Sequence, residues 1–522
     1  MTRPWRAVFC FLVSLFYGGC GAPGGQAASA PAPAPAPAPA GERSRVREPA
    51  VAGLFYPRQR DELTRRLERL LAGASKVPLG KLRGLVCPHA GYEFSGPTAA
   101  LAYKQVAGGE FDTVAVLAPS HYAHFRGAAI PDVDAFSTPL GEVRLSPRAA
   151  QLAKVPPFGD QLPADVERPR WWRESSLEKP PDRETPHTWE HSLEVQLPFL
   201  QHVLPDFRLI PIVFGQAEAA VAARELAAVI DDKTLVIASS DLSHFYPSDV
   251  AEELDASCVR AICDLDTKWL ADENACGKLP VLILLHLARA KGWQAKLLDY
   301  RHSGDTGGDR TNVVGYAAIA FFEGAATAEL PRQELTADER QFLLTLARRA
   351  ITSAVQKKPA APPPVADVPS RLQQRGACFV TLTKAGQLRG CIGHVFACQA
   401  LHRDVATNAV RAALSDSRFP AVTARELPDI KIEISLLTQP RPLEAASPDE
   451  LLQKLRPGVD GVMFSLRGKR ATYLPQVWAQ IPDKEEFLSS LAKKARTSPQ
   501  AWKDPTAAWL TYQVVAFHET EK

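Results

Sequence analysis

The stretch VCPHAGY, residues 86–92, decides the fold of the first half of this chain. Its first residue, Val86, ends a short apolar run from Leu82 that we interpret as a buried strand. Pro88 and His89 follow in the turn. Residues 98–106 are predicted to form the next helix. His89 is therefore expected just past the carboxyl end of a strand, which is where open α/β sheets bind their ligands.

The same arrangement recurs further along the first half of the chain. Apolar runs over residues 111–118, 234–238 and 295–300 predict strands, and each is followed by a turn that contains His or Asp. Amphipathic helices are predicted between the strands, for example over residues 60–71. This alternation predicts an α/β domain with a mainly parallel or mixed sheet flanked by helices.

The chain has 522 residues, more than one hydrophobic core usually holds, so about two or three domains are expected. We place the first domain at residues 46–324, a linker at 325–335, and a second, smaller α+β domain at 336–520. A capping-box pattern at Thr336 and Glu339 predicts the first helix of the second domain. The net charge is only +3 and no nucleic-acid-binding motif occurs in the sequence, so no nucleic-acid partner is expected.

The amino terminus is typical of an export signal. Arg3 and Arg6 precede an apolar run over residues 7–16, which is shorter than the roughly 20 apolar residues of a membrane span. Residues 17–20, YGGC, resemble a lipoprotein box, so we expect a signal over 1–20 and a lipid anchor on Cys20; cleavage after residue 30 is the alternative. Residues 21–45 form an Ala/Pro-rich linker. We therefore expect the chain in the cell envelope or periplasm, attached to a membrane only through the lipid on Cys20.

Imidazoles, carboxylates and one thiol form the candidate site of the first domain. Several strand ends would bring them to one edge of the sheet, and a transition metal needs three or four such ligands from different elements. Two alternatives stay open: Asp241 can cap its turn through its own backbone, and Cys276 can be a small buried apolar residue. The candidates are His89, His121, His191, His244, His302, Glu190, Asp241, Asp305 and Cys276.

Four segments of the first domain resemble the Memo family. They are CPHAGYEFSG (87–96), PSH (119–121), EHSLEVQLPF (190–199) and SSDLSH (239–244). The resemblance implies a fold similar to class III extradiol dioxygenases and an iron or copper ion held by two histidines and a cysteine. Carried over, the ligands are His89, His121 and Cys276, with Glu190 as a possible alternative ligand. The resemblance also places His191, His244 and Asp241 in the same pocket, where we expect them to act as catalytic acid–base groups.

The second domain resembles the AMMECR family. The resemblance rests on GACFVTL (376–382), LRGCIG (388–393), SDSRFP (415–420), EISLLT (433–438) and ATYLPQVW (471–478). Cys391 beside Arg389 is a possible reactive thiol, because a nearby cation favours the thiolate; a tightly packed turn that needs small residues is the alternative. Together the two domains resemble the AmmeMemoRadiSam system, which implies a radical-SAM partner, although export would make direct contact with an oxygen-sensitive partner doubtful.

These observations lead to two hypotheses about function. The first is a metal-binding, oxidoreductase-like protein with an iron or copper site in the Memo-like domain and an AMMECR-like domain of unknown activity. The second is a non-catalytic module for ligand or peptide binding and assembly, with a vestigial metal pocket. A hydrolase that uses Ser239 or Ser240 is disfavoured, because the chain has no nucleophile-elbow sequence around them.

Overall fold

A computed structural model describes residues 45–177, 181–204, 206–324, 335–357, 364–397 and 399–519. The expected export signal, its lipid-attachment cysteine and almost all of the Ala/Pro-rich linker lie outside the described residues, as does most of the expected linker at 325–335. Within the described part of the chain, no helix is both long and apolar enough to cross a membrane.

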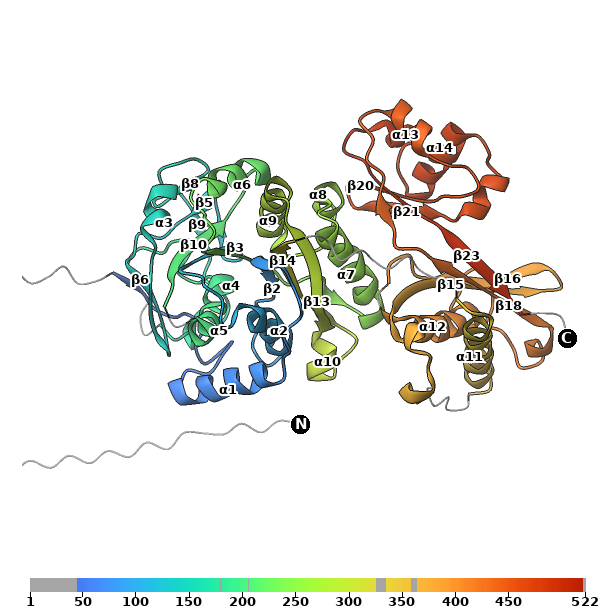
Figure 1. The fold of residues 1–522 in the computed structure, drawn as a ribbon, viewed down its shortest axis with the longest axis horizontal. Coiled ribbons are helices and arrows are strands. Elements are labelled where there is room, and N and C mark those ends of the chain that lie inside the picture. The colour runs from blue at the N-terminus through green and yellow to red at the C-terminus, as the bar shows by residue number, and fades with distance from the viewer. Residues whose placement is uncertain are drawn as a thin grey trace, which may run out of the picture. The chain divides into compact units, whose positions relative to one another are not determined.

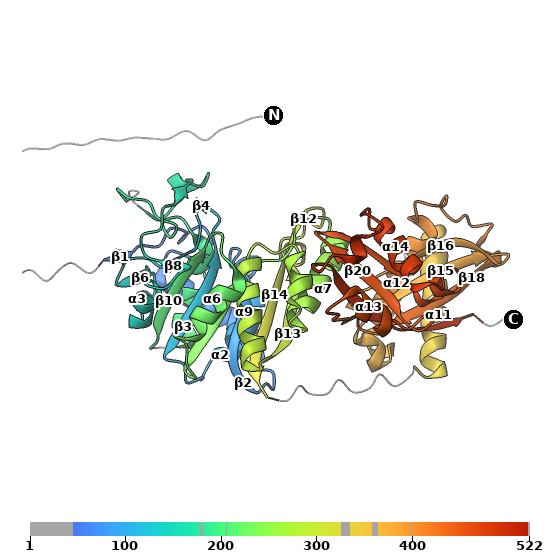
Figure 2. The same ribbon diagram turned by 90° about the horizontal axis from the view of Figure 1, so that it is seen from above.

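The first domain is built on a nine-stranded mixed sheet. Its strands run in the order β12-β14-β2-β11-β3-β10-β5-β8, and β13 pairs with β14. The four central strands β2, β11, β3 and β10 are parallel to one another, whereas β14 and β5 flank them in antiparallel pairings. Figure 2 shows this sheet from above. The strands of this domain are β1 (Val46–Arg47), β2 (Lys81–Cys87), β3 (Thr113–Pro119), β4 (Ala123–His124), β5 (Ala128–Ala129), β6 (Ala135–Thr138), β7 (Gly141–Arg144), β8 (Phe158–Gly159), β9 (Asp165–Val166), β10 (Arg208–Phe214), β11 (Thr234–Ser239), β12 (His244–Tyr246), β13 (Gln294–His302) and β14 (Val313–Glu323).

Helices cover both faces of this sheet (Figure 1). The central strands are apolar at nearly every position, so alternate side chains feed two cores: Leu85 packs on the side of α1, α2 and α5, and Val86 on the side of α6, α7 and α9. Strands that are buried on both faces are typical of parallel sheets with helices on either side. The helices are α1 (Arg60–Ala72), α2 (Gly96–Val106), α3 (Pro147–Leu152), α4 (His191–Glu194), α5 (Leu197–Val203), α6 (Ala219–Ala227), α7 (Ser248–Cys263), α8 (Thr267–Ala271), α9 (Lys278–Lys291) and α10 (Ser303–Gly307).

The second domain contains two antiparallel sheets. One has the order β16-β15-β18-β23, with β17 pairing β15, and the other has the order β19-β22-β20-β21. Its first helix is α11 (Ala337–Val355), and the predicted capping box between Thr336 and Glu339 is present. The remaining elements are α12 (Leu401–Leu414), α13 (Pro448–Lys454), α14 (Lys484–Lys494), β15 (Arg375–Lys384), β16 (Gln387–Gly393), β17 (Gln399–Ala400), β18 (Ile430–Leu437), β19 (Arg441–Pro442), β20 (Gly461–Leu466), β21 (Lys469–Tyr473), β22 (Ala508–Tyr512) and β23 (Val514–His518).

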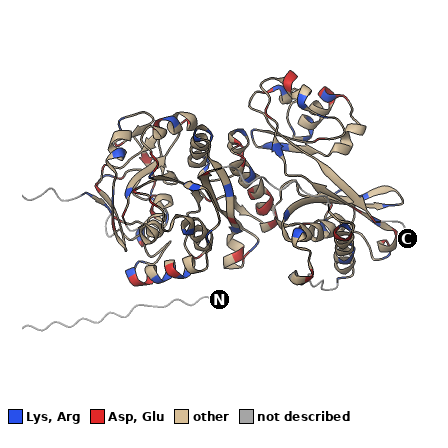
Figure 3. Ribbon diagram, viewed as in Figure 1, with Lys and Arg blue, Asp and Glu red and all other residues tan. Residues whose placement is uncertain are grey.

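The mixed α/β fold class and the second α+β domain are therefore confirmed. Lys and Arg are interspersed with Asp and Glu over both domains, as Figure 3 shows. On α1, for example, acidic Asp61 and Glu62 occupy the first turn and Arg69 the last, which suits the helix dipole.

Candidate metal centre

The candidate site lies at one edge of the sheet, where three neighbouring parallel strands end. β2 ends two residues before His89, β3 ends two residues before His121, and β11 ends two residues before Asp241. Since β11 lies between β2 and β3, these three turns are adjacent. The sequence prediction that strand ends bring these side chains together is confirmed for His89, His121 and Asp241.

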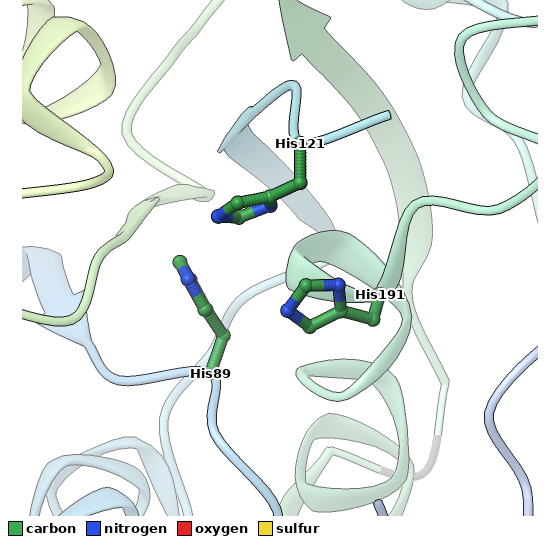
Figure 4. Close-up of side chains that lie close together, drawn as sticks. All are labelled: His89, His121 and His191. Carbon is green, nitrogen blue, oxygen red and sulfur yellow. The ribbon is translucent and has the colours of Figure 1, made fainter. Parts of the chain in front are cut away.

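Three histidines form the centre of the site. His89, His121 and His191 each offer a ring nitrogen, and the three nitrogens lie within 4.8 Å of one another. The ring centroids of His89 and His121 are 5.2 Å apart, and those of His121 and His191 are 4.7 Å apart. Figure 4 shows that the first two come from loops and His191 from the start of a helix, with the rings turned toward one another. The residue types and their spacing fit a transition-metal ion.

Glu190 orients His121. It caps the amino terminus of α4, where its Oε1 accepts from the Ser192 amide at 3.0 Å. The same oxygen lies 2.9 Å from His121 Nδ1, and Oε2 accepts from the His121 amide at 2.6 Å. Both carboxylate oxygens of Glu190, the alternative ligand in the sequence analysis, are thus engaged in the structure. A carboxylate on one ring nitrogen fixes the other nitrogen of a histidine toward a metal.

Electrostatics distinguish His121 from the other two rings. Burial alone would lower the pKa of His121, but the Glu190 carboxylate, together with the Cys276 sulfur, outweighs burial and raises this pKa to about 10. Burial would likewise raise the pKa of Glu190, but the charge and hydrogen bonds of His121 hold it well below its ordinary value. Burial lowers the pKa of His89 and of His191. His89 and His191 are therefore neutral at neutral pH, and an incoming metal has to displace one proton from His121.

Cys276 lies beside His89. Its Sγ is 3.1 Å from His89 Nε2 and accepts from the Asp241 amide at 3.2 Å. Burial raises the pKa of the Cys276 thiol. The loop that carries it packs closely on the end of β11, because a Cβ on Gly277 would lie 2.1 Å from the Ser239 carbonyl oxygen. Cys276 also lines a cavity of about 410 Å³ whose other walls include Ser120, Arg126 and Leu279.

Asp241 and His244 lie around this cluster, and His302 lies elsewhere. Asp241 Oδ1 accepts from the His89 amide at 2.8 Å, and burial raises the pKa of Asp241 to about 6. His244 Nδ1 lies 2.8 Å from the Leu242 carbonyl oxygen, so its Nδ1 carries the hydrogen. His302 instead faces Glu252, with its Nε2 at 3.3 Å from that carboxylate.

Ser239, which the sequence analysis considered only as a nucleophile, has another role. Its Oγ lies 2.8 Å from His89 Nδ1 and 2.8 Å from Gln196 Nε2. Ser240 Oγ donates to the Asp241 carbonyl. The sequence signal for Ser239 was its position as the last residue of a strand whose next turn carries Asp241.

Cys391 of the second domain lies on β16. Its Sγ accepts from the Thr381 hydroxyl at 3.4 Å, and Arg418 donates to its carbonyl at 3.0 Å. A Cβ on the neighbouring Gly390 would lie 2.1 Å from the Ala412 carbonyl oxygen, so the expected need for small residues is present, but in a strand that packs on α12 and not in a turn. A reactive thiol at Cys391 stays a prediction.

Known proteins are similar to both halves of the chain. Residues 47–320 match the Memo-like protein family, and residues 344–517 match the family described as AMMECR1. A MEMO1 family protein of Methanocaldococcus jannaschii is 35% identical over 303 residues, which cover 53% of this chain and 98% of that protein. One of Aquifex aeolicus is 34% identical and covers 53% of this chain and 99% of that protein.

A solved structure is similar to a smaller part of the chain. The crystal structure of an uncharacterized protein from Pyrococcus horikoshii is 31% identical, with a TM-score of 0.34 over 35% of this chain and 93% of that one.

The Memo-like match alone spans more than half of the chain. This chain therefore belongs to the Memo-like protein family, and it carries an AMMECR1 domain behind the Memo-like one.

Proposed function

We propose that the Memo-like domain binds an iron or copper ion and works as a metal-dependent, oxidoreductase-like protein. The convergence of three imidazole nitrogens within 4.8 Å carries this proposal. His89 and His121 are common to two ligand sets, one completed by His191 and the other by Cys276. A fold related to class III extradiol dioxygenases is part of the proposal.

The chemistry of the donor atoms supports a bound ion. Metal ligands have to be unprotonated on the coordinating atom, and burial keeps His89 and His191 neutral. Among the described residues, His191 Nδ1 is buried without a hydrogen bond, and its nearest charged neighbour is Glu190 Oε1 at 3.6 Å. The His191 ring is therefore not committed to a strong hydrogen bond at Nδ1 and can turn toward an ion.

Neighbouring residues suit a small ligand at this centre. When bound, iron or copper supplies one-electron redox chemistry. The cavity of about 410 Å³ lined by Cys276 adjoins this centre and has room for a small organic molecule. Asp241, with a pKa near 6, is suited to exchange a proton with a ligand close to neutral pH.

A second function has an observation of its own. The cluster is internally hydrogen-bonded through the contacts of His121 with Glu190 and of His89 with Cys276. Such contacts can hold the pocket together without an ion, which favours a ligand- or peptide-binding module without turnover as the alternative.

Metal content distinguishes these two functions. We expect the full chain, purified anaerobically without added metal, to carry roughly one iron or copper ion per molecule in elemental analysis. A folded protein that is isolated free of metal, and that takes up neither Fe(II) nor Cu(I) on titration, would contradict the metal-centre proposal. The binding-module alternative would then stand.

The third ligand can be identified by two single substitutions. Thiolate is the softer ligand and favours Cu(I), so we expect Cys276→Ser to weaken Cu(I) binding more than His191→Asn does. Competitive titration of each variant with a Cu(I) chelator measures this difference. The opposite order would assign the third position to His191.

A further inference from the structure

The hydroxyl of Ser239 meets three polar groups at the end of β11. It donates to the Ser192 carbonyl at 2.6 Å and accepts from Gln196 Nε2 at 2.8 Å. Its third neighbour is His89 Nδ1, also at 2.8 Å. Ser239 is fully buried and Gln196 is 1% exposed, so water does not compete for these bonds.

Counting protons fixes the direction of each bond. A serine hydroxyl has one hydrogen to donate and two lone pairs. The Ser192 carbonyl can only accept, so it takes the hydrogen of Ser239. Both lone pairs of Ser239 then require donors, and one of these donors has to be His89 Nδ1.

The orientation of the Gln196 amide confirms this count. Its Oε1 accepts from the Tyr103 hydroxyl at 2.6 Å, and its Nε2 also donates to the Pro88 carbonyl at 3.0 Å. A flipped amide would place Oε1 against the Pro88 carbonyl, two acceptors facing each other. Nε2 therefore faces Ser239, where it can only donate.

The remaining nitrogen of His89 points into the metal centre. With the hydrogen on Nδ1 and the ring neutral, Nε2 carries a lone pair, and it lies 3.1 Å from Cys276 Sγ. A histidine binds metal through its unprotonated nitrogen, and the hydrogen bond of the other nitrogen selects which one that is. A neutral serine thus does for His89 what the Glu190 carboxylate does for His121.

We propose that Ser239, held by Gln196, is a positioning residue that fixes His89 in the Nδ1–H tautomer and so leaves Nε2 free for a ligand. The tautomer assignment stands on the hydrogen bonds alone; its consequence for metal affinity rests on the proposed function. The two parts can therefore fail separately.

The tautomer is measured in the metal-free full chain. In protein with ¹⁵N-labelled histidine, nitrogen chemical shifts separate protonated from unprotonated ring nitrogens, and the loss of a signal pair in His89→Asn assigns His89. We expect Nδ1–H in the wild type and a shift toward Nε2–H in Ser239→Ala. An Nε2–H ring in the wild type, or an unchanged tautomer in folded Ser239→Ala, would overturn the proposal.

A matched pair separates the hydroxyl from the shape of the side chain. Ser239→Thr keeps a hydroxyl, whereas Ser239→Val has the same shape without one. We expect the threonine variant to retain the wild-type tautomer and metal affinity, and the valine variant to bind metal about 10- to 100-fold more weakly. Equal tautomers in the two folded variants would contradict the assignment.

A third variant serves if this pair fails to fold. Gln196→Met removes the amide that supports Ser239 and is expected to give a mixture of His89 tautomers. A pure Nδ1–H ring in this variant would show that Gln196 has no positioning role.

The metal measurement keeps the two proposals apart. A wild type that binds no metal but shows the Nδ1–H ring would contradict the proposed function and support the positioning role of Ser239. Ser240→Ala is the control, because Ser240 is buried on the same turn but, within the described part of the chain, its hydroxyl forms hydrogen bonds only with backbone atoms. Its His89 tautomer is expected to match that of the wild type.

Discussion

Protein in which His89 and His121 are both replaced by alanine is expected to be purified without stoichiometric metal. The two rings belong to both possible ligand sets, so their loss leaves at most His191 and Cys276. Metal sites of this kind need three or four protein ligands, and two do not retain an ion through purification. Elemental analysis of the double variant beside the wild type measures the loss.

The double variant needs a control with the same number of imidazoles removed. His286 on α9 and His518 on β23 are outside the cluster. Their joint replacement by alanine should leave the metal content unchanged. Retention of full metal content by the His89→Ala, His121→Ala protein would move the site elsewhere in the chain.

The second large effect concerns stability. Glu194, one turn beyond His191, is fully buried and pairs with the buried guanidinium of Arg47. Its carboxylate also accepts from the amides of Ala50 and Val51 and from the Tyr56 hydroxyl. We expect Glu194→Ala to lower the free energy of unfolding by about 3–5 kcal/mol, because an unpaired charge is left in the core. Chemical denaturation of the metal-free protein measures it.

Two further variants make the stability prediction specific. Glu167→Ala removes a mostly exposed carboxylate and should change the free energy of unfolding by less than about 1 kcal/mol. Joint replacement of Arg47 by Met and Glu194 by Leu should restore part of the loss, since no charge then stays unpaired. A Glu194→Ala protein as stable as Glu167→Ala would show that the buried pair contributes little.

Much of the sheet could be predicted because each strand is indicated by residues that are consecutive in the sequence. Central strands such as β3 and β11 are continuous apolar runs bounded by turns, and parallel strands end at one edge. This is why His89, His121 and Asp241 could be placed together from the sequence. The helix predicted over residues 60–71 is present as α1, which ends one residue later at Ala72.

The remaining part depends on long-range packing that leaves little local signal. His191 begins a four-residue helix after a long irregular stretch, so its place in the pocket was expected from the family resemblance and not from a local strand-end pattern. His302 shows the converse: it ends β13 in the expected way, yet its ring faces Glu252. The roles of Ser239 and Gln196 depend on hydrogen-bond partners that are distant in sequence. The four strands β19 to β22, which form one of the two antiparallel sheets of the second domain, were not predicted either.

Gly277 has a consequence for how the family should be compared. No side chain fits at this position, because a Cβ would collide with the end of β11. Selection on packing alone would therefore preserve this glycine, whatever the chemistry of Cys276. In an evolutionary comparison, family members that keep the glycine but vary the preceding residue would reveal that the thiol had become dispensable. Family members that keep both residues would not by themselves demonstrate that catalysis requires the thiol.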